Sequence, residues 1–196
     1  MGMKYALTNA VLLDGSRDMK PQTGMSVLVD GEKIADIVSD NRIPAAYERR
    51  DLGGRYLIPG LINMHVHLAG SGKPQKKQRD NEKLVSTIMG SALTRAVAYK
   101  MVCGFAHDAL MSGVTTIRTV GGLGDFDTRL RDEIAAGTRV GPRILAANRG
   151  ISVPGGHMAG SVAIAAHNTE EAIAHLHASA KEKVDLIKLM ITGGVM

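Results

Sequence analysis

Two histidines one residue apart, His65 and His67, lie near the end of the segment 57–68, which reads LIPGLINMHVHL. In an extended strand successive side chains alternate between faces, so residues two apart project from the same face. On a helix the same spacing would turn the two rings about 200° apart. Imidazole is the commonest metal ligand among side chains. The spacing therefore predicts a two-nitrogen metal site at the end of a strand, although two ordinary strand histidines would show the same pattern.

Lys188 is the second residue whose surroundings suggest chemistry, because it stands between Ile187 and Leu189 in an apolar segment. An ammonium group there is costly unless it pairs with a carboxylate or reaches solvent at the strand end. A desolvated lysine, in contrast, is neutral and reactive. Such an amine can add carbon dioxide to form a carbamate, whose two oxygens can bridge two metal ions. From the residue alone, the structural and the chemical interpretations both stay open.

Other side chains are weaker candidates. His157, in the segment VPGGHMAG, is expected on a long loop above the strand ends, where it either contacts substrate or is an ordinary loop histidine. Arg118 is able to bind a substrate carboxylate through two hydrogen bonds, although a structural ion pair is its commoner use. A basic cluster after the two histidines is expected to be a solvated face that at most steers an acidic substrate. It consists of Lys73, Lys76, Lys77 and Arg79.

The composition predicts a soluble, cytoplasmic, globular domain. The chain has 196 residues, of which 44% are hydrophobic, and this is enough for one core. A net charge of +5 with only 3% aromatic residues argues against a nucleic-acid surface. Cys103 is the single cysteine, so no disulfide framework is expected and a reducing compartment is favoured. No apolar run approaches the roughly 20 residues of a membrane span, so no membrane partner is expected.

The elements that must position these residues change character near residue 57. Residues 4–58 read as strands and turns, with a hairpin around Asp30 and Gly31. Strands are then expected at 57–67, 114–120, 142–147 and 185–191, alternating with helices at 82–112, 125–137 and 168–184. Asn168 and Glu171 resemble a capping box at the start of the last helix. A loop of roughly twenty residues after the third of these strands is a candidate functional loop.

Alternating strands and helices predict an α/β fold with parallel strands and right-handed crossovers. An open doubly wound sheet and a (β/α)8 TIM barrel both fit, and in both the ligand lies at the carboxyl ends of the strands. We expect His65, His67 and Lys188 to converge there. A barrel takes about 250 residues, so about four strands indicate a partial barrel. The expected domains are a β unit over 1–57 and half of a barrel over 58–196.

Several motifs in this order resemble the amidohydrolase superfamily, and within it the prolidase-like and imidazolonepropionase-like metal-dependent hydrolases. The resemblance is carried by the two histidines after PGLIN, by GVTTIRTVGG, by the GGH loop and by IKLMITGG. It spans nearly all of residues 4–196. It implies that residues 1–57 are the N-terminal portion of a urease-like β-sandwich. It also implies that His65, His67 and a carboxylated, bridging Lys188 bind one or two divalent ions, often zinc.

The implied function is hydrolysis of a C–N (amide) bond by a metal-activated water. The small-molecule substrate would be an amide, such as a dipeptide cleaved by a prolidase-like dipeptidase or the ring of a cyclic amidohydrolase substrate. Family members also use two later histidines and an aspartate, which would follow Met196. The alternative is therefore a catalytically incomplete, truncated fragment or half-enzyme that works as a homo-oligomer or with a complementary chain. Asn63 and Thr119 stand where the family often has Asp.

Overall fold

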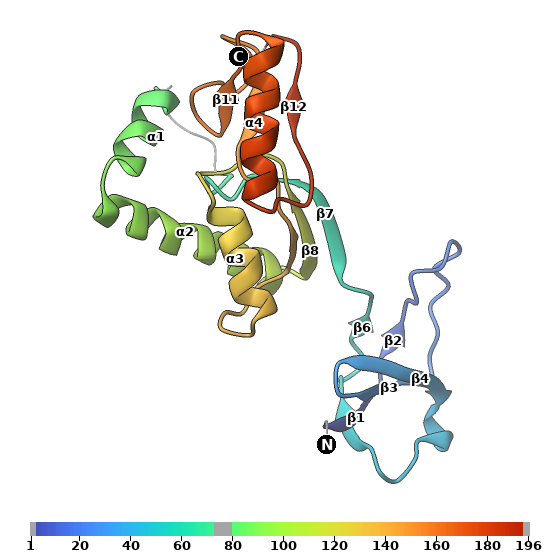
Figure 1. Ribbon diagram of the computed structural model, residues 1–196. Helices are drawn as coiled ribbons and strands as arrows, with labels where there is room; N and C mark the ends of the chain where they lie inside the picture. Colours follow the sequence, from blue (N-terminus) through green and yellow to red (C-terminus); the bar gives the residue numbers. More distant parts are fainter. Residues whose placement is uncertain (1–2, 73–79, 194–196) are drawn as a thin grey trace. The chain divides into compact units, whose positions relative to one another are not determined.

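The computed structural model describes residues 3–72 and 80–193 (Figure 1). The chain divides into two compact units, Met1–Pro59 and Gly60–Met196. The basic cluster of Lys73, Lys76, Lys77 and Arg79 lies outside the described residues. Within the described part of the chain, no helix is long and apolar enough to cross a membrane.

The first unit is built from strands. One sheet has the order β4-β3-β1-β5, and β2 pairs in parallel with β6. The expected hairpin is confirmed, because β3 and β4 are antiparallel and join through Gly31, whose φ of 61° suits glycine. The strands are β1 (Lys4–Thr8), β2 (Val11–Leu12), β3 (Met25–Asp30), β4 (Lys33–Ser39), β5 (Glu48–Asp51) and β6 (Tyr56–Leu57).

The second unit holds two parallel sheets, in the orders β7-β8-β9 and β11-β10-β12. The α/β class is therefore confirmed, while the partial barrel stays a prediction because the parallel strands fall into two separate sheets. The strands are β7 (Leu61–Val66), β8 (Val114–Thr119), β9 (Arg143–Leu145), β10 (Gly150–Ser152), β11 (Ala163–Ala165) and β12 (Leu189–Met190).

The helices of this unit are α1 (Asn81–Met89), α2 (Ala92–Met111), α3 (Phe126–Ala135) and α4 (Thr169–Lys181). The expectation of one continuous helix over 82–112 is wrong. Gly90 ends α1, and Ser91 begins α2 as an N-cap whose hydroxyl accepts a hydrogen bond from the Thr94 backbone. The capping box of α4 is confirmed, because Asn168 Oδ1 accepts from the Glu171 backbone at 2.8 Å.

Two further expectations differ from the structure. The loop after the third strand contains the short strands β10 and β11, and β12 is a two-residue strand rather than the expected run over 185–191. In the described chain β12 pairs only with β10, which has three residues, so the ladder is short.

The core of the second unit lies between the β7-β8-β9 sheet and its helices. Helix α2 contacts β8, and α3 contacts β9 (Figure 1). Ile117 of β8 and Ile144 of β9 are buried in this core with Leu130 of α3. At the start of β7, Gly60 approaches the Thr115 side chain so closely that an added Cβ would collide with it. This contact explains the glycine after Pro59 and brings β7 alongside β8.

Candidate metal centre

His65 and His67 lie at the carboxyl end of β7, and their Nε2 atoms are 3.3 Å apart. Zinc–nitrogen bonds of about 2.0–2.1 Å at the tetrahedral angle place two ligand nitrogens about 3.3 Å apart. The two Nε2 atoms are therefore already separated by the distance that one tetrahedral zinc ion requires. In the metal-free protein the same distance allows one ring to donate an N–H to the other.

His67 is oriented by the loop after β8. Its Nδ1 lies 3.0 Å from the Gly121 carbonyl oxygen. Because a carbonyl only accepts, Nδ1 carries the hydrogen and Nε2 presents its lone pair towards His65. A Cβ on Gly121 would lie 3.1 Å from His67 Nδ1, and φ there is +144°. Position 121 therefore requires glycine, because a Cβ there would crowd the His67 ring. From the sequence alone, Gly121 indicated only the end of a strand.

The pKa of His65 is lowered from its ordinary value. Burial lowers its pKa first, and the positive charges of His67, Lys188, Arg118 and His157 lower it further. A lowered pKa favours the neutral ring, which is the form that binds a metal ion. All four other candidate residues are therefore near enough to act electrostatically on His65, although their chain segments are far apart in sequence.

Lys188 is half-buried and lies directly before β12, which belongs to the other sheet of this unit. Its carbonyl accepts a hydrogen bond from the Ile151 backbone at 2.9 Å, which ties the segment to β10. A Cβ on Gly150 would lie 3.4 Å from Lys188 Cγ, so the lysine stem passes closely over this glycine.

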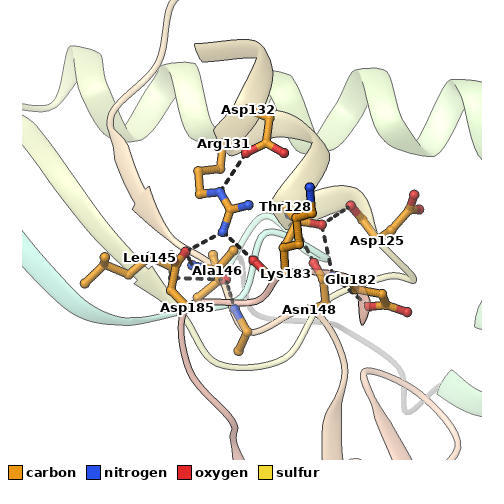
Figure 2. Close-up of polar contacts among 12 residues, drawn as sticks. Asp125, Thr128, Arg131, Asp132, Leu145, Ala146, Asn148, Glu182, Lys183 and Asp185 are labelled. Carbon is orange, nitrogen blue, oxygen red and sulfur yellow. Dashed lines mark hydrogen bonds and ion pairs between the residues drawn. The ribbon is translucent and has the colours of Figure 1, made fainter. Parts of the chain in front are cut away.

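Asp185, three residues before Lys188, anchors this segment through the contacts that Figure 2 shows. Its Oδ2 accepts from the Ala146 backbone and from Arg131 Nη1 of α3, both at 2.8 Å. Arg131 Nη1 also donates to the Lys183 carbonyl at 2.9 Å. This anchor was not predicted from the sequence, where its one signal is a charged residue that opens an apolar segment.

A second anchor in Figure 2 is Asn148, which is fully buried just after β9. Its Nδ2 donates to Thr128 Oγ1 at 3.0 Å and to Glu182 Oε2 at 2.8 Å, and its Oδ1 accepts from the Thr128 backbone at 3.0 Å. A buried amide with such satisfied contacts fixes α3 against the end of α4.

The two weaker candidates have different surroundings. His157 is exposed in the turns that follow β10. Arg118 is half-buried on β8, and its Nε donates to the Met64 carbonyl at 2.8 Å. No ion pair of Arg118 is present among the described residues, so the structure gives it a backbone acceptor in place of a carboxylate.

Within residues 3–72 and 80–193, no group of three or more His, Cys, Asp and Glu side chains is placed to hold a metal ion. A centre in this part of the chain would therefore depend on two imidazoles and the lysine. Next to His67 lies a cavity of about 380 Å³ with a mainly apolar wall. Its apolar side chains are Leu84, Val85, Ile88, Leu123, Met158 and Val162.

Asp127 of α3 is a buried carboxyl group behind the same glycine loop. It is 1% exposed, and its Oδ2 has no hydrogen-bond partner among the described residues. A Cβ on Gly122 would lie 2.5 Å from this oxygen, so the second glycine of the loop leaves room for the carboxyl. Burial raises the pKa of Asp127 to about 6, against the opposing effect of a hydrogen bond from Thr119.

Asp127→Asn is expected to stabilise the protein above pH 6. The folded pKa of about 6 lies above the ordinary value of 3.8, so the carboxyl favours folding below about pH 4 and this contribution is lost as the pH rises through 6. The difference corresponds to about 3 kcal/mol. About 1.4 kcal/mol of it falls between pH 5 and pH 8, because the rest is already lost below pH 5. Urea unfolding at these two pH values measures this part, with Asp108→Asn on the exposed face of α2 as control. Equal pH dependence in wild type and Asp127→Asn would contradict the prediction.

Comparison with known proteins gives a family match and a set of relatives. A model described as "Amidohydrolase family" matches residues 56–196. The imidazolonepropionase of Streptomyces avermitilis is 30% identical over 110 residues, which cover 50% of this chain and 26% of the relative. The dihydroorotase of Mycobacterium tuberculosis is 29% identical over 89 residues, which cover 45% of this chain and 21% of the relative.

Solved structures match over more of the chain. A putative prolidase from Bifidobacterium longum has a TM-score of 0.74 and 31% identity, covering 98% of this chain and 42% of its own. A Xaa-Pro dipeptidase with bound methionine has a TM-score of 0.73 and 28% identity, covering 98% of this chain and 48% of its own. The chain thus spans less than half the length of these relatives.

Proposed function

Because the chain belongs to the amidohydrolase family, we propose that it supplies the first metal-binding part of an enzyme that hydrolyses amide C–N bonds. The observation that carries the proposal is the 3.3 Å separation of the His65 and His67 Nε2 atoms. A divalent ion held there, which we take to be zinc, would acidify a water molecule and polarise the scissile carbonyl. The two histidines would hold the ion, and the bond from His67 Nδ1 to the Gly121 carbonyl would keep the lone pair of His67 Nε2 directed at it.

Lys188 is the third ligand in this proposal, as a carbamate. The unprotonated amine would add carbon dioxide through a new N–C bond and release one proton to give the carbamate anion. Starting from the ammonium form two protons leave, so the side-chain charge changes from +1 to −1. Arg118, a permanent cation, acts electrostatically on His65 and would therefore also act on an ion bound there. An anionic Lys188 would offset this positive charge, whereas an ammonium group would add to it.

We propose a dipeptide rather than a cyclic amide as the substrate. Two solved structures described as a putative prolidase and a Xaa-Pro dipeptidase each match over 98% of this chain, with 31% and 28% identity. The apolar cavity beside His67 is suited to an apolar residue of such a dipeptide, and His157 would contact the bound substrate from the turns after β10.

The single, buried Cys103 supports a reducing, cytoplasmic location.

A second candidate is a half-enzyme that needs a complementary chain. It is favoured by the ligand set, because the described residues hold no group of three or more His, Cys, Asp and Glu side chains placed to bind a metal ion. The two candidates share the metal centre and differ in whether this chain alone can complete a catalytic cycle.

One experiment tests both candidates. The purified chain is titrated with zinc and then assayed against Xaa-Pro dipeptides and cyclic amides. We expect zinc to bind and no substrate to be hydrolysed, because three ligands without a carboxylate proton acceptor leave the chemistry incomplete. Absence of zinc binding would contradict the metal centre. Hydrolysis that disappears in His65→Ala would show that this chain is catalytically complete and would remove the half-enzyme.

A further inference from the structure

The pairing of β7 with β8 is irregular at the two histidines. Asn63 lies opposite Ile117, and Val66 lies opposite Thr119. Between these two pairs β7 advances by three residues while β8 advances by two. Met64 and His65 therefore lie opposite a single residue of β8, which is a β-bulge in β7. A bulge leaves backbone groups out of the ladder, bends the strand and redirects its side chains.

Two side chains bind the backbone groups at this bulge. The His65 N–H donates to Asn63 Oδ1 at 3.1 Å, and the Met64 carbonyl accepts from Arg118 Nε at 2.8 Å. Asn63 acts locally, in the manner of an asparagine that bonds the backbone two residues ahead and so competes with regular strand pairing. Arg118 acts from β8, the strand that faces the bulge.

The bulge explains how the two rings converge. In a regular strand, residues two apart are separated by about 6.6 Å and their side chains run side by side. Here the ring centroids of His65 and His67 are 5.2 Å apart, the ring planes are inclined by 63°, and the Nε2 atoms are 3.3 Å apart. A bent strand allows the two tips to approach more closely than their backbone positions do.

We propose that Asn63 and Arg118 are positioning residues that hold this bulge and thereby align His65 and His67 on one metal ion. The identity of the ion rests on the function proposed above, whereas the role of the two residues in the bulge does not. Arg118 is then engaged through its Nε with the strand that carries the metal ligands.

The first test measures zinc affinity and the visible spectrum of bound Co²⁺, which reports the ligand geometry. Asn63→Ala and Arg118→Ala are expected to weaken zinc binding about 10–100-fold, as loss of the partners of metal ligands does. Asn63→Asp keeps an acceptor oxygen at the same place and should retain both affinity and spectrum. The matched control is Asn168→Ala, which removes a bond of the same kind at the start of α4 and should change neither.

The second test needs no metal. Hydrogen exchange at the His65 amide should be slow in the wild type and in Asn63→Asp, and faster in Asn63→Ala. If Asn63→Ala changes neither this exchange nor zinc affinity, or changes the exchange alone, the positioning role is overturned. If the wild type binds no zinc but Asn63→Ala still releases the His65 amide, the proposed function fails while the bulge assignment stands.

Discussion

Replacement of either His65 or His67 by alanine is expected to lower zinc affinity more than about 100-fold. This loss is larger than the loss expected when only the hydrogen-bond partner of a metal ligand is removed. Each ring supplies one of the two nitrogens that lie 3.3 Å apart, so each variant leaves a single imidazole. One imidazole together with Lys188 offers too few ligands for the tetrahedral site of a zinc ion. Competition with a chromophoric zinc chelator measures the affinity.

The control for this prediction is His177→Ala, an exposed histidine of α4. It removes an imidazole of the same kind and should leave zinc affinity unchanged, which separates the centre from adventitious surface binding. Thermal unfolding of all three variants checks that the fold persists, because His67 also bonds the Gly121 carbonyl. Zinc binding that survives in both His65→Ala and His67→Ala would contradict the assignment of the ligands.

The second large effect is expected in the state of association. The chain alone should self-associate, because within the described residues β7 pairs only with β8 and so presents a free edge. Ile62 of β7 is 64% exposed and Met64 is 45% exposed, while Leu145 of β9 lies at the far side of the same sheet with 36% exposure. An apolar edge strand with unpaired backbone groups favours pairing with another chain. Sedimentation velocity would show species larger than the monomer.

Ile62→Lys tests whether this edge is responsible. A lysine on an edge strand opposes strand addition, so the variant should shift towards the monomer. Leu93→Lys is the matched control, because Leu93 is 76% exposed and belongs to helix α2 and not to an edge strand, and it should leave association unchanged. A monodisperse wild-type monomer with one cooperative unfolding transition would show that the edge needs no partner.

Local patterns in the sequence were sufficient for the α/β class, the β3–β4 hairpin and the cap of α4, because each depends on residues a few positions apart. They failed where several local signals compete. The apolar periodicity through 82–112 outweighed Gly90 and Ser91, although these two residues end one helix and cap the next. Strands of two or three residues, such as β10 and β12, are too short for a period to be detected.

The candidate site divides in the same way. By itself, the spacing of His65 and His67 determined that both belong to one face of a strand, and the setting of Lys188 determined that its charge needs compensation. Only the tertiary structure brought Gly121 to His67 and Arg118 to Met64, in each case across 54 positions of sequence. Contacts over such separations depend on the register between paired strands, and the bulge in β7 changes that register by one residue. No periodicity in a single strand contains this information, because the register is set jointly by the two paired strands and by helices α1 and α2, which lie between them in sequence.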